Sequence, residues 1–289
     1  MRAVRLLDAH QLEERAVAVT GERPWVDDTA RAFDLVALEY DQTNRANPIL
    51  EHMRRRSLAM LRRYAPPGAE LLDLGCGPGT DQQELVASGY CVTAIDASPV
   101  MVREARRRAD AAGGAHRPTV LCRSIEQLGK FQPASFDAAF SNFGPLNCVA
   151  DLHDTARQLR LALRPGGVLV ASVMGRVCPW EVALFLSRGQ VGRAFVRFRR
   201  GLVGVPLKHG TVWTHYITPG AFARAFEAAG FAQRDLAGLG VVAPPPYMEA
   251  FASRNRGTVE RLLAIDEVVG GWPLVRGMGD HFLIVLQRT

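Results

Sequence analysis

The chain has 289 residues, of which 48% are hydrophobic and 22% are charged, with a formal net charge of +6. This composition excludes a wholly disordered or fibrous chain, and the length suits one large α/β domain with insertions. The five cysteines are dispersed without a CxxC spacing, which argues against both a zinc site and a disulfide framework.

The basic balance is compatible with a nucleic-acid or anionic-membrane partner. The arginines, however, are spread over several predicted helices, without the interleaved aromatic residues of a single-strand-binding face. We therefore interpret them as a solvated surface and do not expect a nucleic-acid partner. No run reaches about 18 apolar residues, and no signal-peptide core is visible, so we expect no membrane span and a cytoplasmic location.

Residues 1–66 are predicted to form an N-terminal extension followed by a helical cap. From Thr29 onward, apolar residues recur at helical spacing as far as Tyr40. A second helix is predicted over residues 49–64, and the Pro-Pro-Gly sequence at residues 66–68 ends it. The main domain is then expected to cover residues 67–289.

A glycine-rich turn follows the first predicted strand, which ends at residue 74. Gly75, Gly77 and Gly79 stand at every second position, after Asp73 and before a predicted helix over residues 81–88. Glycine permits positive φ angles and close approach of a ligand, and a helix start offers unpaired N–H groups. The turn therefore suits an anionic or carboxylate-bearing ligand, although its spacing departs from the dinucleotide fingerprint G-x-G-x-x-G.

The second predicted strand, residues 92–96, ends at an acidic residue, Asp96. An acidic side chain about 20 residues after a glycine-rich turn binds ribose hydroxyls in doubly wound nucleotide sites. A helix over residues 100–112 follows, which Ser98 or Asp96 can cap. Further strands are predicted over residues 119–122, 136–141 and 168–173.

Four of these segments together resemble the class I S-adenosylmethionine (SAM) dependent methyltransferases. The sequences LLDLGCGPGT at residues 71–80 and AIDAS at residues 94–98 resemble the first two motifs of that family. The sequence SFDAAFSN at residues 135–142 resembles its fourth strand, and LRPGGVLV at residues 163–170 resembles the turn into its fifth. The resemblance implies a doubly wound α/β fold, with a seven-stranded, mostly parallel, Rossmann-like sheet and a last strand that inserts antiparallel at the sheet edge.

The same resemblance implies SAM as the cofactor and S-adenosyl-L-homocysteine as the product. Many family members carry an aspartate where this chain has Ser124, so a role for that side chain departs from the family pattern. The residues expected to bind the cofactor are Tyr40, Asp73, Gly75, Cys76, Gly77, Gly79, Asp96, Ala97, Ser98, Met101, Ser124, Ile125, Glu126 and Asn142.

Two insertions are expected in the main domain, at residues 175–218 and 241–279. The first is predicted to hold helices over residues 180–186 and 194–198 and a strand over residues 211–218. Thr218 is expected to cap a helix over residues 219–230, and the last two strands are predicted at residues 233–239 and 280–286. The second insertion is predicted to hold one helix over residues 247–269. We interpret residues 175–218 as a lid over the acceptor site, because they follow a strand at the ligand-binding edge of the sheet.

The candidate substrate contacts are Phe143, Asn147, Trp180 and Tyr216. Within the lid, Phe185 is expected to act with Trp180 on substrate binding. His215 is the candidate general base or acceptor-orienting group, because the pKa of imidazole suits proton removal near neutral pH. The alternative is that His215 only holds the lid through a backbone hydrogen bond. No Ser-His-Asp pattern and no metal-ligand spacing competes with these residues.

The sequence favours an enzyme that methylates a small molecule beneath the cap and lid. An RNA or protein methyltransferase and a non-catalytic SAM-binding protein stay open as alternatives. The sequence Asn-Phe-Gly-Pro after the fourth strand is not the element with which nucleic-acid N-methyltransferases read a flipped base. The glycine spacing disfavours an NAD-dependent oxidoreductase. A monomer and a homodimer are both compatible with the sequence.

Overall fold

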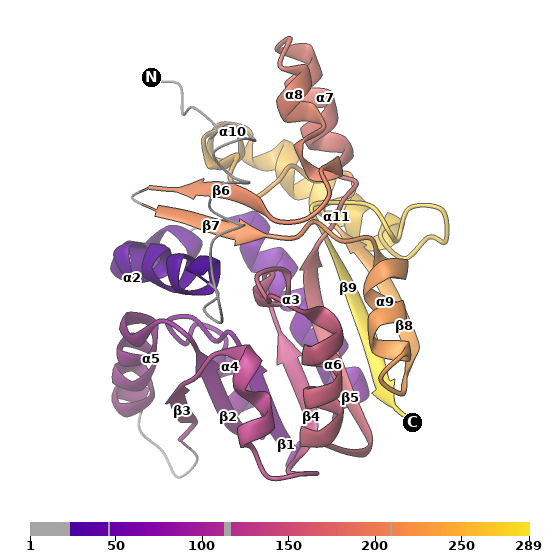
Figure 1. The fold of residues 1–289 in the computed structure, drawn as a ribbon. Helices are drawn as coiled ribbons and strands as arrows, with labels where there is room; N and C mark the ends of the chain where they lie inside the picture. Colours follow the sequence, from indigo (N-terminus) through magenta and orange to yellow (C-terminus); the bar gives the residue numbers. More distant parts are fainter. Residues whose placement is uncertain (1–23, 46, 113–116, 209) are drawn as a thin grey trace.

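The computed structural model describes residues 24–45, 47–112, 117–208 and 210–289, so most of the predicted N-terminal extension lies outside it. The described chain forms a seven-stranded sheet in the order β3-β2-β1-β4-β5-β9-β8, with helices on both faces (Figure 1). In these ranges, no helix is both long enough and apolar enough to cross a membrane.

All strands of this sheet run in the same direction except β9, which is antiparallel to both of its neighbours, β5 and β8. The last strand was predicted at the sheet edge, but β8 takes that place. The reason is visible in burial, because the first six residues of β9 are buried whereas β8 exposes Gln233 and Arg234. The strands are β1 Glu70–Leu74, β2 Cys91–Asp96, β3 Thr119–Cys122, β4 Phe136–Ser141, β5 Leu163–Met174, β8 Phe231–Leu239 and β9 His281–Arg288.

The two faces of the sheet carry separate cores, as the alternation of side chains along a strand requires. Leu71 packs toward one core and Leu72 toward the other. The first face is covered by α3 Pro48–Tyr64, α4 Gln82–Ala87, α5 Pro99–Ala112 and α11 Arg256–Val269. The second is covered by α6 Leu152–Ala162, α9 Pro219–Glu227 and the 3-10 turn η1 Ile125–Lys130.

Residues 175–218, which the sequence predicts to be a lid and which are called the lid below, stand above the carboxyl edge of the parallel strands (Figure 1). They contain α7 Pro179–Ser187, α8 Val191–Ala194, the 3-10 turn η3 Val196–Phe198, and a hairpin of β6 Val203–Leu207 and β7 Gly210–Thr214. The strand β6 was not predicted, because its Gly204 and Pro206 are poor strand formers. One helix was predicted over residues 194–198, where α8 and η3 form two short turns.

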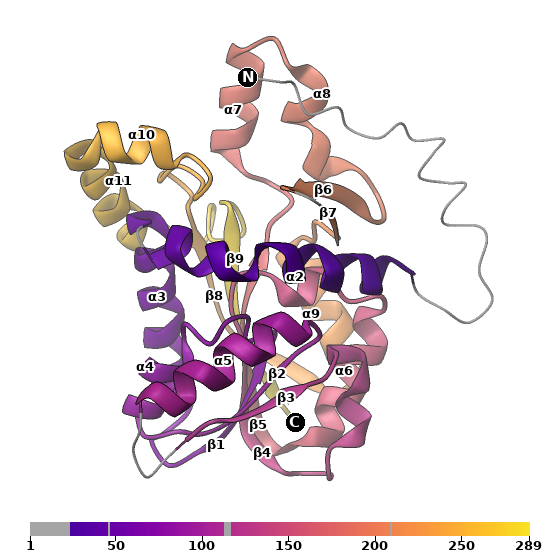
Figure 2. The same ribbon diagram turned by 90° about the vertical axis from the view of Figure 1, so that its left-hand side faces the viewer.

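The helix α2 Pro24–Arg45 crosses between the β6–β7 hairpin and α5 (Figure 2). Thr29 ties it to the hairpin, because its hydroxyl accepts a hydrogen bond from the backbone N–H of Trp213 at 3.1 Å. In the second insertion, the single predicted helix is broken at Asn255 into α10 Glu249–Arg254 and α11. The helix α2 and residues 175–218 therefore lie on the side of the sheet where the strands β1, β2, β3 and β4 end, whereas α3 and α11 cover one of its faces.

Candidate active site

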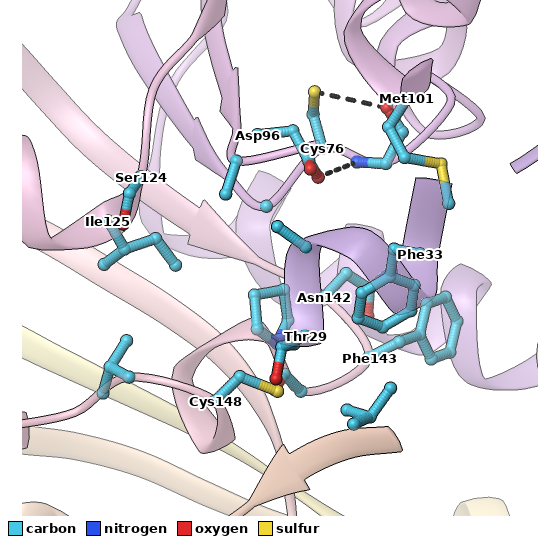
Figure 3. Close-up of a pocket in the computed structure, with 18 of the residues that line it drawn as sticks. Thr29, Phe33, Cys76, Asp96, Met101, Ser124, Ile125, Asn142, Phe143 and Cys148 are labelled. Carbon is cyan, nitrogen blue, oxygen red and sulfur yellow. Dashed lines mark hydrogen bonds between the residues drawn. The ribbon is translucent and has the colours of Figure 1, made fainter. Parts of the chain in front are cut away.

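A cavity of about 190 Å³ lies between the carboxyl ends of the first four strands and α2 (Figure 3). Ligands of open α/β sheets bind at this edge. Most of the residues predicted to bind the cofactor line its wall. They are Gly75, Cys76, Gly77, Asp96, Ala97, Met101, Ser124, Ile125, Glu126 and Asn142.

The three glycines of the turn after β1 have positive φ angles for different reasons. A Cβ on Gly75 would lie 2.4 Å from the Cβ of Pro145, so any side chain there would collide. A Cβ on Gly79 would lie 3.0 Å from the Cα of Ala105, and this glycine packs against α5 instead of lining the cavity. A Cβ on Gly77 would meet no atom within 4 Å among the described residues, so this glycine faces open space in the cavity wall.

Asp96 at the end of β2 fixes the shape of this turn. Its Oδ2 accepts a hydrogen bond from the N–H of Gly77, and its Oδ1 accepts one from the N–H of Ser98, both at 2.9 Å. Burial raises the pKa of Asp96, and the charge of Asp34 adds to this effect, although the N–H donors work against it. Each carboxylate oxygen keeps lone pairs for a further donor, such as a ribose hydroxyl.

Two other buried acceptors near the turn lack hydrogen-bond partners among the described residues. They are Oδ2 of Asp73 and Oδ1 of Asn142. Burial, together with the charges of Asp81 and Asp96, raises the pKa of Asp73 well above its ordinary value. Unpartnered buried acceptors are costly unless a ligand or water completes them. These groups and the open backbone at Gly77 fit a cofactor that carries hydroxyl and ammonium donors, as SAM does.

Two of the residues predicted to bind the cofactor form side-chain hydrogen bonds that stabilise the starts of neighbouring helices. Ser98 caps α5, because its hydroxyl accepts from the N–H of Met101 at 3.0 Å and donates to Asp34 at 2.5 Å. Ser124 caps η1, where it accepts from the N–H of Glu126 at 3.3 Å. Tyr40 lies in α2, but its side chain is outside the described part of the structure.

A second cavity of about 690 Å³ lies beneath the lid. Apolar side chains of α3, α7 and β6 form much of its wall, including Leu50, Phe185 and Val203. It shares Arg54, Phe143 and Met174 with the first cavity, so the two cavities meet at these three residues.

Phe143, which follows β4, is held in an uncommon conformation at this meeting point. Its φ angle is +61°, a region that residues other than glycine adopt rarely and usually under tertiary constraint. The guanidinium of Arg54 lies 5.3 Å from the centroid of its ring and also forms an ion pair with Asp81. The amide of Asn142 donates to the other oxygen of Asp81 at 2.9 Å, so the boundary between the cavities is tied together by polar contacts.

A buried chain of charges joins the lid to the start of β9. Arg197 of η3 pairs with Glu181 of α7, and its Nη2 donates to Oδ1 of Asp280 at 2.6 Å. Its Nη1 also donates to the carbonyl oxygens of Gly175 and Asp280, at 3.1 and 2.9 Å. Oδ2 of Asp280 lies 3.0 Å from Nδ1 of His281.

The neighbours of Asp280 in this chain keep its carboxylate ionised. Burial alone would raise the pKa of Asp280, but the charge of Arg197, together with the hydrogen bonds from Arg197 and His281, outweighs it and lowers that pKa well below its ordinary range. Tyr216 lies against Arg197, whose guanidinium is 5.0 Å from its ring centroid. Burial raises the pKa of the Tyr216 phenol to about 12.

The structure brings only part of the predicted substrate set together. Phe143, Phe185 and Tyr216 line the lid cavity. Asn147 and Trp180 are in neither wall. The side-chain amide of Asn147 bonds the backbone of Met174 and His215, and the Nε1 of Trp180 donates to the carbonyl of Val242 at 2.5 Å. Both side chains therefore tie segments together.

His215 also lies outside both walls. It lines a separate hollow together with Trp25, Asp151 and His153. Its backbone N–H donates to the carbonyl of Asn147 at 2.8 Å. Burial lowers the pKa of its imidazole, although a hydrogen bond to the backbone of Gly201 works in the opposite direction.

Five residues that line or support the two cavities were not among the predicted site residues: Arg54, Met174, Arg197, Asp280 and His281. A signal was available for the last two. An antiparallel strand inserted in a parallel sheet begins at the edge where its neighbours end, and Asp280-His281 directly precede the apolar run of the predicted last strand. Arg197 gave no comparable signal, since it stands among other arginines in a basic run.

Comparisons with known proteins point to one family. Residues 71–167 match the family model of a methyltransferase domain. A ubiquinone biosynthesis O-methyltransferase from Xanthomonas axonopodis pv. citri is 31% identical over 177 residues, which cover 61% of this chain and 68% of that protein. One of the same name from Xanthomonas campestris pv. campestris is 36% identical over 114 residues, or 39% of this chain. That match covers 46% of the relative, so the chain spans about half of its length.

A solved structure supports the same fold. The S-adenosylmethionine-dependent methyltransferase from Mesorhizobium loti superposes with a TM-score of 0.51 at 22% identity. The superposition covers 80% of this chain and 96% of that one. The strand order and the antiparallel β9 described above are therefore features of a known architecture.

Proposed function

The chain belongs to the class I SAM-dependent methyltransferases, and from that premise we propose that it transfers the methyl group of SAM to a small molecule held beneath the lid. The observation that carries this proposal is the meeting of two cavities at Phe143 and Met174. A donor in the first cavity and an acceptor in the second would face each other there, shielded from water by the lid and α2.

In this proposal, residues around the first cavity hold the cofactor. Asp96 accepts hydrogen bonds from the ribose hydroxyls, and the bare backbone at Gly77 admits the ligand closely. Met101 and Ile125 provide apolar walls for the adenine. Bound SAM supplies a methyl group that is already activated on a sulfonium, so the protein's share is orientation and exclusion of water.

The lid cavity suits a small and largely apolar acceptor. Its volume of about 690 Å³ is comparable with typical ligand sites, which span roughly 300–1,000 Å³. Phe185 and Val203 supply apolar contacts, and Tyr216 and Tyr247 supply hydroxyls. Relatives named for O-methylation in ubiquinone biosynthesis support a small-molecule acceptor.

The test is product formation from SAM that carries a ¹³C-labelled methyl group. The protein is incubated with fractionated small molecules, and mass spectrometry searches for products that gain the label. We expect labelled small molecules with the wild-type protein and none with Asp96→Ala. Label found instead in RNA or protein would support the first alternative. SAM binding in calorimetry without label in any fraction would support a non-catalytic SAM-binding protein.

A further inference from the structure

His281 stands where the two cavities meet. It is the first residue of β9, and its register partner across the sheet is Met174, which lines both cavities. Its imidazole contacts the ring of Phe143 edge to face, with 6.3 Å between the ring centroids. His281 also lines the lid cavity. The imidazole is therefore beside the place where an acceptor atom would meet the donor.

The two ring nitrogens of His281 have different surroundings. Nδ1 lies 3.0 Å from the ionised carboxylate of Asp280, so Nδ1 carries the proton and donates it. Nε2 is then an acceptor, and it is buried with no hydrogen-bond partner among the described residues. A carboxylate that fixes the tautomer of a histidine leaves its other nitrogen ready to receive a proton.

The charged groups next to His281 are those of the buried chain. Glu181 and Asp280 bring two negative charges and Arg197 brings one positive charge, so these three side chains sum to −1. A proton that moves from an acceptor to Nε2 therefore enters a site whose neighbouring charges sum to −1.

We propose that His281 is the catalytic base that deprotonates a hydroxyl group of the acceptor, and that Asp280 is the residue that positions it. This inference rests on the proposed function and adds the acceptor class to it. In the reaction, the hydroxyl proton moves to Nε2 and the oxygen forms a new O–C bond with its own electron pair. The C–S bond of the sulfonium breaks, and its electron pair stays on sulfur.

An imidazole base also limits which hydroxyl groups of an acceptor can be deprotonated. An imidazole ionises at about pH 6.5 and a phenol at about pH 10, whereas a saturated alcohol is a far weaker acid. Proton transfer to His281 is therefore practical for a phenol or an enol. The apolar wall formed by Phe185, Val203 and Val205 suits such a ring. We infer an aromatic or enolic hydroxyl as the acceptor group.

The test uses nitrophenols as probes, because their phenolate absorbs visible light and their phenol does not. A panel of nitrophenols of increasing size is titrated into the protein saturated with S-adenosylhomocysteine, at a pH where each free probe is largely protonated. We expect at least one probe to bind with a rise in phenolate absorbance. Binding without that rise, or no binding by any member of the panel, would overturn the proposal.

Three histidine variants assign the proton acceptor. His281→Gln should bind the same probe without the phenolate signal and should methylate an acceptor phenol about 10²–10⁴-fold more slowly. His153→Gln, on the exposed side of α6, is the matched control and should match the wild type. A signal that survives in His281→Gln and disappears in His215→Gln would assign the role to His215 and overturn the proposal.

Calorimetry with SAM separates the possible failures. Unchanged SAM affinity in His281→Gln shows that the variant is folded, and His281→Asn is used if it is not. A wild-type protein that does not bind SAM would refute the proposed function itself. A protein that binds SAM and methylates small molecules, but gives no phenolate signal, would refute only the assignment of His281.

Discussion

The buried carboxyl groups at the two cavities have pKa values shifted in opposite directions. Around the first cavity, Asp73 and Asp96 have raised pKa values, and one oxygen of Asp73 lacks a hydrogen-bond partner among the described residues. Beneath the lid, Asp280 has a lowered pKa because Arg197 and His281 pair with it. The first cavity thus leaves buried acceptors to which the proposed cofactor can bind, whereas in the second the charged side chains pair with one another. We therefore expect substitutions at the first cavity to change SAM affinity, and substitutions in the buried chain of charges to change the free energy of unfolding.

The largest effect expected from this contrast is on stability. Arg197→Ala would leave Asp280 and Glu181 buried without their partner, and breaking a buried pair in this way costs about 3–5 kcal/mol. The free energy of unfolding, measured with urea, should fall by that amount. Arg199→Ala removes an exposed arginine of the same segment and should change it by less than about 0.5 kcal/mol. Equal losses in the free energy of unfolding for the two variants would show that the buried ion pairs of Arg197 add no stability.

The next effect is on cofactor binding. Asp96→Ala removes the carboxylate expected to accept two ribose hydroxyls, and each hydrogen bond to a charged group contributes about 1.5–3 kcal/mol. The affinity for SAM should fall by at least about 100-fold in calorimetry. Asp110→Ala, at an exposed carboxylate of α5, serves as the control. A folded Asp96→Ala protein with wild-type affinity would remove Asp96 from the cofactor site.

The contrast also explains how far the sequence could predict the molecule. The cofactor half depends on local order, because strand, glycine turn and acidic strand end follow each other within residues 70–96. The lid half depends on contacts between distant segments, such as Arg197 with Asp280 and Trp180 with Val242. No local pattern reports such pairs. The same reason accounts for Asn147 and Trp180, whose residue types suggest ligand contacts but whose bonds join distant segments.

A smaller effect is expected at two aromatic residues of the lid, one of which should affect acceptor binding and the other stability. Phe185 lines the lid cavity, whereas Trp180 packs against Phe251 with its N–H bonded to Val242. Phe185→Ala should raise the acceptor KM about 10-fold, as expected for the loss of about 1.5 kcal/mol of apolar contact. Trp180→Ala should instead lower the free energy of unfolding by about 2 kcal/mol. Neither should change SAM affinity, and a reversed pattern would redefine the acceptor wall.

The smallest effect concerns pH. The raised pKa of Asp96 means that protons compete with SAM above the ordinary carboxyl range, which lies at about 3.9. Calorimetry should show SAM affinity falling as the pH is lowered, beginning at a pH above that ordinary range. The lowered pKa of Asp280 has the opposite sign, since its stabilisation is full above about pH 3.9 and is lost only as pH falls further. Urea unfolding that weakens over the same range as SAM binding would contradict this order.

The proposed function requires donor and acceptor to meet between the two cavities. A crystal structure of the protein with S-adenosylhomocysteine would show whether they can. We expect the ribose hydroxyls on Asp96 and the thioether sulfur beside Phe143 and Met174, facing the lid cavity. A ligand whose sulfur points away from these residues, or a Phe143 ring that closes the passage between the cavities, would contradict this expectation.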